Sequence, residues 1–373
     1  MEEKNNTCLL IMPALFSGGA EKQYRYIMSE IADKNRKVVV LLLNLPLKGE
    51  EEKTKIFIDK HKNIEFHQLD GNVLNCNKNS KISIFLSKII ALYKQWRWIH
   101  SYLKNNRINV VMFSYVTQLL LTPLFNKNNI KVIFNERNTG RQICDKAFKI
   151  KLLKKCFAII ANSKYAANYI EERTGLDVEI YNNGMEKREI EHLTHNFFVI
   201  TVPARIVKIK NQMLVLKSLN LMENKQDIRI KFAGITEDEQ YERELKKYIE
   251  KHNLQENVEF MGYVNNMNSL YEQTDILILP SFEEGTPNVL LEAYMYRLFP
   301  LASNIPMNKD CCLYEELLFD PNDPQMLANK IDLVRNKLLV KDVKKVLDSN
   351  ELYVNSEYSI KKLKERYSRL LGC

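Results

Sequence analysis

The chain has 373 residues, of which 45% are hydrophobic and 27% charged, a composition typical of soluble globular proteins. This length exceeds one ordinary hydrophobic core and fits two domains. The seven cysteines form no CxxC pair and no Cys/His spacing, which argues against a disulfide framework or a zinc site. We therefore expect a cytoplasmic, two-domain protein with reduced thiols.

The N-terminal region begins with acidic residues and its apolar run is short, so we expect neither a secretory signal nor a membrane anchor. Residues 108–126 have the length of a membrane span, but they include Asn109, Gln118 and Pro123. We predict a strand over residues 109–113, followed by a short buried helix.

Short β-branched runs alternate with helical patterns along the whole chain. In the first half, the predicted strands cover residues 8–12, 37–43, 64–68, 109–113, 131–134 and 157–161. After a polar stretch near residues 185–197, the predicted strands cover residues 198–202, 228–234, 258–260, 275–280 and 298–303. Nearly continuous apolar strands separated by helices predict parallel sheets that are covered on both faces.

Two such sheets in series predict an α/β protein with two Rossmann-like domains, over residues 1–184 and 185–355, facing a central cleft. Open α/β sheets bind ligands at the carboxyl ends of their strands, so this cleft is the expected active site. We expect a last segment, residues 356–373, to form a helix that packs back on the N-terminal domain. Its apolar stripe consists of Ile360, Leu363, Tyr367 and Leu371.

The net charge of +9 is unevenly distributed. Residues 1–183 contain 29 Lys and Arg against 17 Asp and Glu, and no acidic residue lies between Asp70 and Glu136. Such a basic region attracts a polyanion, either an anionic membrane surface or a nucleic acid.

One helix of this basic region contains both tryptophans. We expect Trp98 to point outward beside Lys94 and Arg97, an arrangement that suits a membrane interface. The alternative is a charged, solvated face on a buried helix. The stripe assigned to the core consists of Ile82, Phe85, Leu86, Ile89, Tyr93 and Trp96.

Glycine is scarce, at 11 residues, and several glycines lie where a strand gives way to a helix. Glycine at such a turn lets a ligand approach the backbone, whose N–H groups in the first helical turn then face it. Each glycine alone is explained as well by an ordinary turn or cap. Together they favour a phosphate or sugar site built from main chain. They are Gly18, Gly19, Gly234, Gly262 and Gly285, with Gly184 in a turn between the two halves.

An organic diphosphate needs positive charge when no metal is present. Arg205 follows the strand over residues 198–202 and Lys210 precedes the next helix, so both side chains can converge on one phosphate group. The alternative is that both are solvated surface residues. The first half has no DxD element, and "GGAEK" differs from GxGxxG, so we expect neither a metal-bridged diphosphate nor dinucleotide binding.

The stretch "PSFEEGTPNVLLEA" places Glu284 just before a helix and Glu292 within it. Pro287 suits the first helical position and leaves the following N–H groups available to a phosphate. The helix rises roughly 7.5 Å from Pro287 to Glu292, which separates the two carboxylates too far for an acid/base dyad. They can instead hold hydroxyls at two points of an extended ligand. The alternatives are compensation of the helix dipole by Glu284 and solvation of Glu292, although an acid among apolar neighbours should have a bound partner.

In these residues, the chain resembles the GT-B-fold retaining glycosyltransferases of family GT4, over essentially its whole length. The resemblance rests on "SGGAEK", "ANSKYAANYI", "NNG", Arg205 with Lys210, "EFMGYV" and, above all, the paired glutamates of "PSFEEGTPNVLLEA". It implies transfer of a sugar from a nucleotide-sugar donor to a hydroxyl, with retention of configuration and with neither metal nor cofactor. Family frequency favours a UDP-sugar.

Many members of this family build bacterial polysaccharides, such as capsule or O-antigen, on polyprenyl diphosphate lipids. The resemblance therefore implies a polyprenyl-diphosphate-linked saccharide as the acceptor. It also implies an enzyme that is associated peripherally with the inner face of the cytoplasmic membrane.

By the same resemblance, Arg205 and Lys210 hold the diphosphate and stabilise the leaving group. Glu284 reaches the donor sugar, and Glu292 takes the ribose hydroxyls. The other donor-binding residues that the resemblance implies are Gly18, Gly19, Gly262, Tyr263, Gly285, Thr286, Pro287, Asn288 and Val289.

Two features depart from the family pattern. Many relatives have a histidine where this chain reads "FNERNTG", so Glu136, Arg137 and Asn138 would line the acceptor side. A polar loop with an internal ion pair is the alternative. Arg297 and Phe299 stand where glycine and proline are common, which alters a helix end and leaves the donor contacts unchanged.

Two other functions are weighed against this one. A nucleotide-sugar epimerase of GT-B fold would need further acid/base residues, and none of the six histidines lies in a recognised motif. A basic nucleic-acid-binding protein would leave Glu284 and Glu292 unexplained. We therefore expect no nucleic-acid partner.

Overall fold

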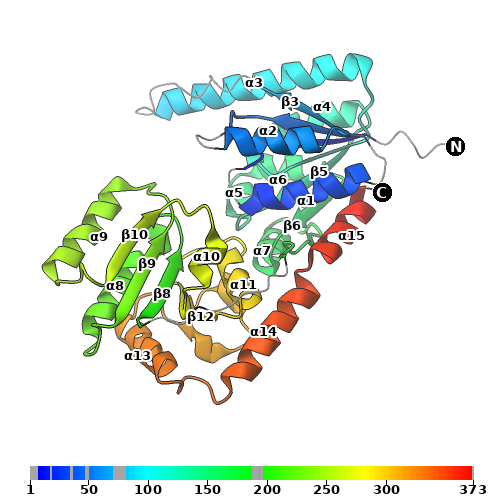
Figure 1. Cartoon of the computed structure of the whole chain (residues 1–373). Coiled ribbons are helices and arrows are strands. Elements are labelled where there is room, and N and C mark those ends of the chain that lie inside the picture. The colour runs from blue at the N-terminus through cyan, green and yellow to red at the C-terminus, as the bar shows by residue number, and fades with distance from the viewer. Residues whose placement is uncertain are drawn as a thin grey trace. The chain divides into compact units, whose positions relative to one another are not determined.

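The computed structural model describes residues 7–16, 19–33, 37–46, 50–69, 81–186, 193 and 196–371. It divides into two compact units (Figure 1). Unit 1 combines Met1–Gly184 with Ile360–Cys373, and unit 2 is Met185–Ser359. Each unit has its own sheet and its own hydrophobic core.

Unit 1 contains a seven-stranded sheet in the order β3-β2-β1-β4-β5-β6-β7, and every neighbouring pair is parallel. The six strands predicted for the first half are confirmed, whereas β7 was not predicted because two exposed residues carry no apolar pattern. The strands are β1 (Cys8–Met12), β2 (Val38–Leu42), β3 (Ile64–Gln68), β4 (Val110–Phe113), β5 (Lys131–Glu136), β6 (Ala158–Ala161) and β7 (Glu179–Ile180).

Helices cover both faces of this sheet. Successive residues of a strand point to opposite faces, so Leu9 and Ile11 pack into one core cluster, while Leu10 and Met12 pack into the other. On the Leu10 face lie α1 (Gly19–Asp33), α2 (Glu51–Lys60) and α15 (Ile360–Leu371). On the Leu9 face lie α3 (Lys81–Asn105), η3 (Val116–Leu121), α4 (Thr122–Lys127), α5 (Arg141–Cys144), α6 (Ala147–Leu153) and α7 (Lys164–Thr174).

The C-terminal helix α15 lies beside α1 (Figure 1). Leu363, Tyr367 and Leu371 of its apolar stripe are buried in the same cluster as β1. The side-chain amide of Asn135, near the end of β5, donates to the Tyr367 hydroxyl at 3.0 Å. Chain segments more than 200 residues apart therefore form one core, and α15 is an integral part of unit 1.

Unit 2 contains a six-stranded parallel sheet in the order β10-β9-β8-β11-β12-β13. The five strands predicted for the second half are confirmed, and only the two-residue β13 was missed. The strands are β8 (Phe198–Pro203), β9 (Ile228–Ala233), β10 (Val258–Gly262), β11 (Ile276–Leu279), β12 (Phe299–Ser303) and β13 (Leu318–Phe319). The prediction of two parallel-sheet α/β domains is thus confirmed.

Both faces of the second sheet are also covered. Ile276 and Ile278 of β11 pack into one cluster, and Leu277 and Leu279 pack into another. The first cluster includes residues of α8 (Gln212–Leu221), α9 (Glu239–Lys251) and α13 (Pro324–Arg335), and the second includes residues of α10 (Met267–Tyr271) and α11 (Asn288–Met295). The remaining elements are η4 (Lys208–Lys210), α12 (Pro306–Lys309), η5 (Glu315–Leu317) and α14 (Val343–Glu357).

The uncharged window over residues 108–126 forms β4, η3 and the start of α4, as predicted. Among the helices of the described residues, none has the length and apolar character needed to cross a bilayer.

The face of α3 that packs on unit 1 differs from the predicted one. Leu86, Ile89, Tyr93 and Trp96 were assigned to the core, but they are 50%, 47%, 57% and 41% exposed. The side chains of Ile82 and Phe85, the other two members of that stripe, lie outside the described residues.

The opposite face of α3 is the buried one, and it includes polar side chains. Gln95 is buried and accepts a hydrogen bond from the Gln118 amide of η3 at 3.4 Å. Trp98, which was expected to point outward, packs against the core and stacks on Tyr102 with ring centroids 4.9 Å apart. Apolar spacing selected the wrong face because both faces of this helix carry large apolar residues.

Candidate active site

The predicted donor-site residues gather at the carboxyl edge of the unit 2 sheet. Arg205 and Lys210 follow β8, Gly234 follows β9, Gly262 ends β10, and Glu284 follows β11. Because parallel strands all run in one direction, their following loops meet at the same edge. The structure thus places at one edge residues that are distant in the sequence, such as Arg205 and Glu284, which are 79 positions apart.

Lys210 and Glu284 form an ion pair with 2.6 Å between Nζ and Oε1. The side chains are only 15% and 11% exposed, so each charge has lost much of its hydration and depends on the other. A backbone hydrogen bond from Phe282 N–H to the Ile209 carbonyl, at 2.9 Å, ties the loop after β11 to the turn η4. This contact fixes the positions from which the two side chains meet.

Arg205 is held by a different carboxylate. Its Nη1 lies 2.6 Å from each carboxylate oxygen of Glu237, and the two side chains are 54% and 41% exposed. The predicted convergence of Arg205 and Lys210 on one group is therefore not present in this structure. An exposed pair contributes little free energy, so Arg205 can exchange partners at low cost.

Gly234 allows the turn after β9 to pack against the turn after β8. A Cβ atom on Gly234 would lie 2.2 Å from the Ala204 carbonyl oxygen and 2.9 Å from the Arg205 nitrogen. The role of this glycine is thus to position the backbone from which Arg205 extends. Gly262 differs, because its φ of +62° lies in the left-handed region, while a Cβ added there would meet no described residue within 4 Å apart from its chain neighbours.

The helix after β11 begins one residue later than predicted. Pro287 is the N-cap of α11, with ψ of 69°, and its carbonyl accepts from the Leu290 and Leu291 N–H groups at 2.9 and 3.2 Å. The N–H of Asn288 donates to the Thr286 carbonyl at 2.8 Å. The turn is therefore closed by its own backbone. Gly285 and Val289 are partly exposed, whereas Thr286 and Pro287 are buried.

Glu292 has a buried partner, as its apolar surroundings required. The Tyr271 hydroxyl, from α10, donates to Glu292 Oε2 at 2.8 Å. Burial of Tyr271, reinforced by the charge of Glu292, raises the pKa of this phenol well above its ordinary value of 10. Tyr271 is therefore a permanent donor that orients the carboxylate. Sequence reasoning missed it because the two residues lie 21 positions apart on different helices.

Arg297 explains one departure from the family pattern. It follows α11 with φ of +49°, a left-handed conformation that favours glycine. Asp348 and Glu351 of α14 hold its guanidinium at 2.6 and 2.7 Å. The substitution therefore changes the helix end, and two ion pairs accompany the unfavourable backbone conformation.

The acceptor-side candidates of unit 1 lie at the end of β5 and directly after it, and they differ in exposure. Glu136 and Arg137 are 3% and 9% exposed, while Asn138 is exposed. Glu136 accepts from the Asn138 N–H at 2.7 Å, and burial raises the pKa of its carboxyl. Arg137 donates to the Asn183 side chain at 2.6 Å, and its charge partly opposes the effect of burial on the pKa of Glu136.

Two further candidates lie at the start of α1. Gly18 is outside the described residues, and Gly19 is the first residue of the helix. In unit 2, Tyr263 directly follows β10 and is 60% exposed. Within the described ranges, no cluster of three or more His, Cys, Asp or Glu side chains is arranged to hold a metal ion.

Solved structures place the whole chain in a known class, the two-domain α/β proteins of GT-B fold. HepE from Anabaena, solved with UDP and glucose, matches with a TM-score of 0.74 at 15% identity, over 98% of this chain and 99% of that chain. Sucrose-phosphate synthase from Thermosynechococcus elongatus matches with a TM-score of 0.79 at 14% identity, over 98% of each chain. At such identities the likeness concerns the fold alone.

A family model matches unit 2. Residues 185–353 are similar to the glycosyl transferases group 1 family. The match covers nearly all of unit 2, including Lys210, Glu284 and Glu292.

Two curated relatives are bacterial transferases. An α-1,4-N-acetyl-D-galactosaminyltransferase of Campylobacter jejuni, whose name specifies a saccharide on PP-undecaprenol, is 29% identical over 168 residues, or 44% of this chain. An α-1,3-galactosyltransferase of Escherichia coli, named for UDP-Gal and α-D-GlcNAc-diphosphoundecaprenol, is 26% identical over 203 residues, or 52% of this chain. The matched regions span 45% and 48% of the relatives' own lengths.

Proposed function

We propose that this chain is a retaining glycosyltransferase that moves a sugar from a nucleotide-sugar, a UDP-sugar, to a hydroxyl of a polyprenyl-diphosphate-linked saccharide. Surface polysaccharide synthesis is the expected context. The observation that carries the proposal is the Lys210–Glu284 pair, set at the carboxyl edge of a sheet in a glycosyl transferases group 1 domain. The names of the two relatives support the acceptor class, and the neighbour solved with UDP supports the donor.

Donor binding is proposed to exchange the partners of the paired side chains. The diphosphate displaces Glu284 from Lys210, and the released carboxylate accepts hydrogen bonds from hydroxyls of the donor sugar. Arg205 leaves the exposed Glu237 for the same diphosphate. Glu292, which the Tyr271 hydroxyl orients through Oε2, accepts hydrogen bonds from the ribose hydroxyls. The base lies near Gly262 and Tyr263.

In the transfer step, the bond between the anomeric carbon and the diphosphate oxygen breaks, and its electron pair stays on the diphosphate. The acceptor hydroxyl oxygen forms the new bond on the face that the leaving group vacates, and its proton passes to a phosphate oxygen. Lys210 and Arg205 stabilise the charge that develops on the diphosphate. This scheme uses no metal and no cofactor.

Nucleotide binding tests the donor site. We expect UDP at about 100 times its dissociation constant to add about 2.7 kcal/mol to the stability of the purified chain, measured by thermal unfolding without divalent metal. Glu292→Ala should abolish this shift, because it removes the ribose contact. Glu250→Ala, an exposed glutamate of α9, is the matched control and should retain it. Stabilisation by GDP alone would change the assigned base. No shift with UDP or GDP, with or without metal, would contradict the proposal.

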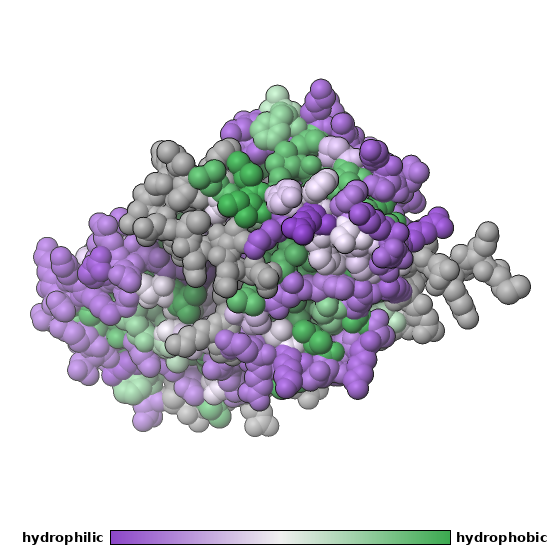
Figure 2. Space-filling view, turned by 90° about the horizontal axis from the view of Figure 1, so that it is seen from above, coloured by the Kyte–Doolittle hydropathy of each residue, from purple (hydrophilic) through white to green (hydrophobic). Residues whose placement is uncertain are grey.

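We further propose that the enzyme associates with the cytoplasmic face of the membrane, where a lipid-linked acceptor lies. The α3 surface, defined as Leu86, Ile89, Ile90, Tyr93 and Trp96, is an exposed apolar face. The helix has basic but no acidic residues, and Lys88 and Arg97 beside this surface are exposed. Hydrophobic patches lie among hydrophilic ones on the side of the molecule on which α3 lies (Figure 2). An apolar helix face with flanking cations suits an anionic bilayer surface.

Vesicle binding tests the α3 surface. We expect the chain to float with vesicles rich in phosphatidylglycerol, and salt should weaken this binding. The double variant Ile89→Ser/Trp96→Ser should reduce binding at least about tenfold, because two side chains that enter the interface are lost. Leu352→Ser, at a still more exposed leucine of α14, should bind like the wild type. Equal binding to neutral and anionic vesicles, or equal loss in both variants, would rule out this surface.

A further inference from the structure

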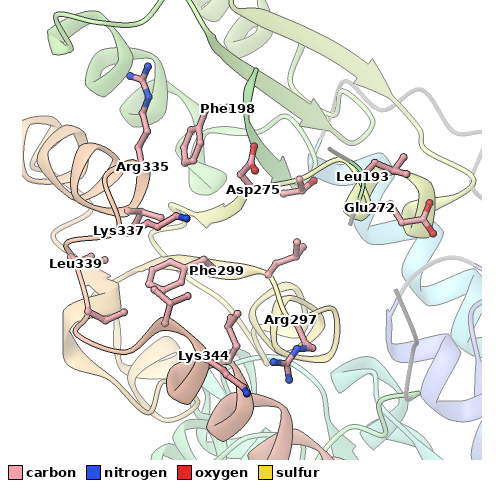
Figure 3. Close-up of a pocket in the computed structure, with 16 residues that line it drawn as sticks. Leu193, Phe198, Glu272, Asp275, Arg297, Phe299, Arg335, Lys337, Leu339 and Lys344 are labelled. Atoms are coloured by element: carbon pink, nitrogen blue, oxygen red, sulfur yellow. The ribbon is translucent and has the colours of Figure 1, made fainter. Parts of the chain in front are cut away.

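A cavity of about 650 Å³ opens at the edge of the unit 2 sheet where the strands begin (Figure 3). Phe198 is the first residue of β8, Phe299 is the first residue of β12, and Asp275 directly precedes β11. Lys210 and Glu284 instead follow the carboxyl ends of β8 and β11. The cavity and the candidate donor site therefore lie at opposite edges of the same sheet.

The walls of the cavity continue the hydrophobic core. Most of the apolar side chains that line it are only partly buried against the main core cluster, so they leave space that the described residues do not fill. Apolar surface without packing partners forfeits dispersion contacts, and a hydrocarbon chain would restore them. The wall residues are Phe198, Phe299, Val334, Leu339, Val343 and Leu347.

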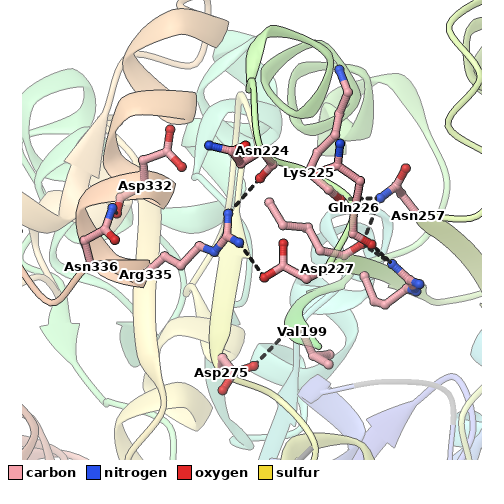
Figure 4. Close-up of polar contacts among 12 residues, drawn as sticks. Val199, Asn224, Lys225, Gln226, Asp227, Asn257, Asp275, Asp332, Arg335 and Asn336 are labelled. Atoms are coloured by element: carbon pink, nitrogen blue, oxygen red, sulfur yellow. Dashed lines mark hydrogen bonds and ion pairs between the residues drawn. The ribbon is translucent and has the colours of Figure 1, made fainter. Parts of the chain in front are cut away.

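Two arginines at the cavity have carboxylates of their own. Arg335 pairs with Asp227 and donates to the Asn224 carbonyl at 2.7 Å (Figure 4). Arg297 pairs with two carboxylates of α14, as described above. The charges of both arginines are therefore already neutralised. Arg335 links the end of α13 to the residue before β9, and Arg297 links α14 to the residues before β12.

Lys337 and Lys344, which also line the cavity, are exposed, and neither ammonium has an ion pair or hydrogen bond within the part of the chain that the structure describes. Lys337 has φ of +58° just after α13, and the Leu338 N–H donates to the Leu333 carbonyl at 2.7 Å to close the helix end. This turn directs the Lys337 ammonium into the cavity (Figure 3). Exposed cations beside an apolar cavity attract the charged head of an anionic ligand whose apolar part enters the cavity.

Two acids, Glu272 and Asp275, line the wall on the other side of the cavity (Figure 3). The Val199 N–H donates to Asp275 Oδ2 at 2.7 Å, which holds this carboxylate at the sheet edge (Figure 4). A bound anion is repelled from this wall and attracted to the lysine wall. The charge distribution thus sets the direction of the ligand as well as its sign.

We propose that this cavity binds an anionic single-chain lipid. Its hydrocarbon chain fills the apolar space, and its carboxylate or phosphate head contacts Lys337 and Lys344. The volume lies within the range of about 300–1,000 Å³ that small-molecule sites occupy. The ligand joins the α13–α14 connection to the sheet and takes no part in sugar transfer.

The test uses the full chain and two probes, each below its micellar concentration. Laurate represents a free fatty acid, and lysophosphatidylglycerol represents a membrane lipid. Isothermal titration calorimetry should show that at least one of the two probes binds saturably, with one molecule per chain. Lys344→Gln should weaken that binding about tenfold or more, because a charge-assisted contact is lost. Lys337→Gly should do the same without loss of stability, because glycine tolerates the left-handed conformation.

The matched control is Lys345→Gln, which removes an exposed neighbouring cation that does not line the cavity and should leave binding unchanged. Dodecyltrimethylammonium, a cation with a chain of the same class, should bind at least about tenfold more weakly than laurate. Equal affinity for this cation, equal loss in Lys344→Gln and Lys345→Gln, or no saturable binding of either anionic probe would each overturn the proposal. Thermal unfolding of each variant without ligand verifies that it is folded.

Discussion

The Lys210→Met variant is expected to lose about 100- to 1,000-fold in kcat/KM for sugar transfer, the range found when one fixed charge-stabilising donor is removed from an active site. The proposed reason is that Lys210 stabilises negative charge on the departing diphosphate, which is greatest in the transition state. The measurement is the steady-state rate with UDP-sugar and a polyprenyl-diphosphate-linked acceptor. Lys208→Met is the matched control, because Lys208 lies in the same turn in an exposed pair with Glu244 at 3.3 Å.

Loss of Lys210 also leaves Glu284 partly buried and unpaired, which by itself destabilises the fold. The double variant Lys210→Met/Glu284→Gln removes both charges, so it should regain thermal stability while activity stays low. Activity that returns together with stability would show that the pair is structural. Equal losses in the Lys208 and Lys210 variants would likewise exclude a specific role for Lys210.

Gly234→Ala is expected to destabilise unit 2 by about 3 kcal/mol, at the upper end of the cost of overpacking. The added Cβ would lie 2.2 Å from a backbone oxygen, so the turn that carries Arg205 must move. Gly262→Ala provides the comparison, because open space surrounds that position and only the left-handed backbone resists the change, at a cost of about 1 kcal/mol.

Hydrogen exchange of β8 and β9 amides measures this effect within unit 2, without relying on a single unfolding transition of a two-domain chain. Faster exchange in Gly234→Ala than in Gly262→Ala is the expected order. The reverse order would mean that the turn after β9 relaxes easily and does not hold Arg205 in place.

Some features of the fold were predictable because they repeat along the sequence. Strands buried on both faces need nearly continuous apolar residues, and this pattern located all strands of the described residues except the two-residue β7 and β13. The last helix was found from its apolar stripe, of which Leu363, Tyr367 and Leu371 are buried. It starts at Ile360, four residues after the expected start at residue 356, because α14 extends to Glu357.

The orientation of α3 was not predictable in the same way. Large apolar residues lie on both of its faces, so spacing alone cannot select the one that packs. The structure buries the Gln95 and Tyr102 side, because contacts with η3 and the sheet are available there. Leu86, Ile89 and Tyr93 are left exposed, which moves the proposed membrane surface to the face that was assigned to the core.

In the candidate site too, some features follow from local sequence and others follow only from tertiary packing. The sequence alone determined the two parallel-sheet α/β domains and the types of side chain that gather at strand ends, because strand periodicity and loop composition are local properties. Only the tertiary structure decided which charges meet: Lys210 with Glu284, Arg205 with Glu237, and Glu292 with Tyr271. These pairs join residues 74, 32 and 21 positions apart, and such distances are closed only by the packing of whole elements around the sheet.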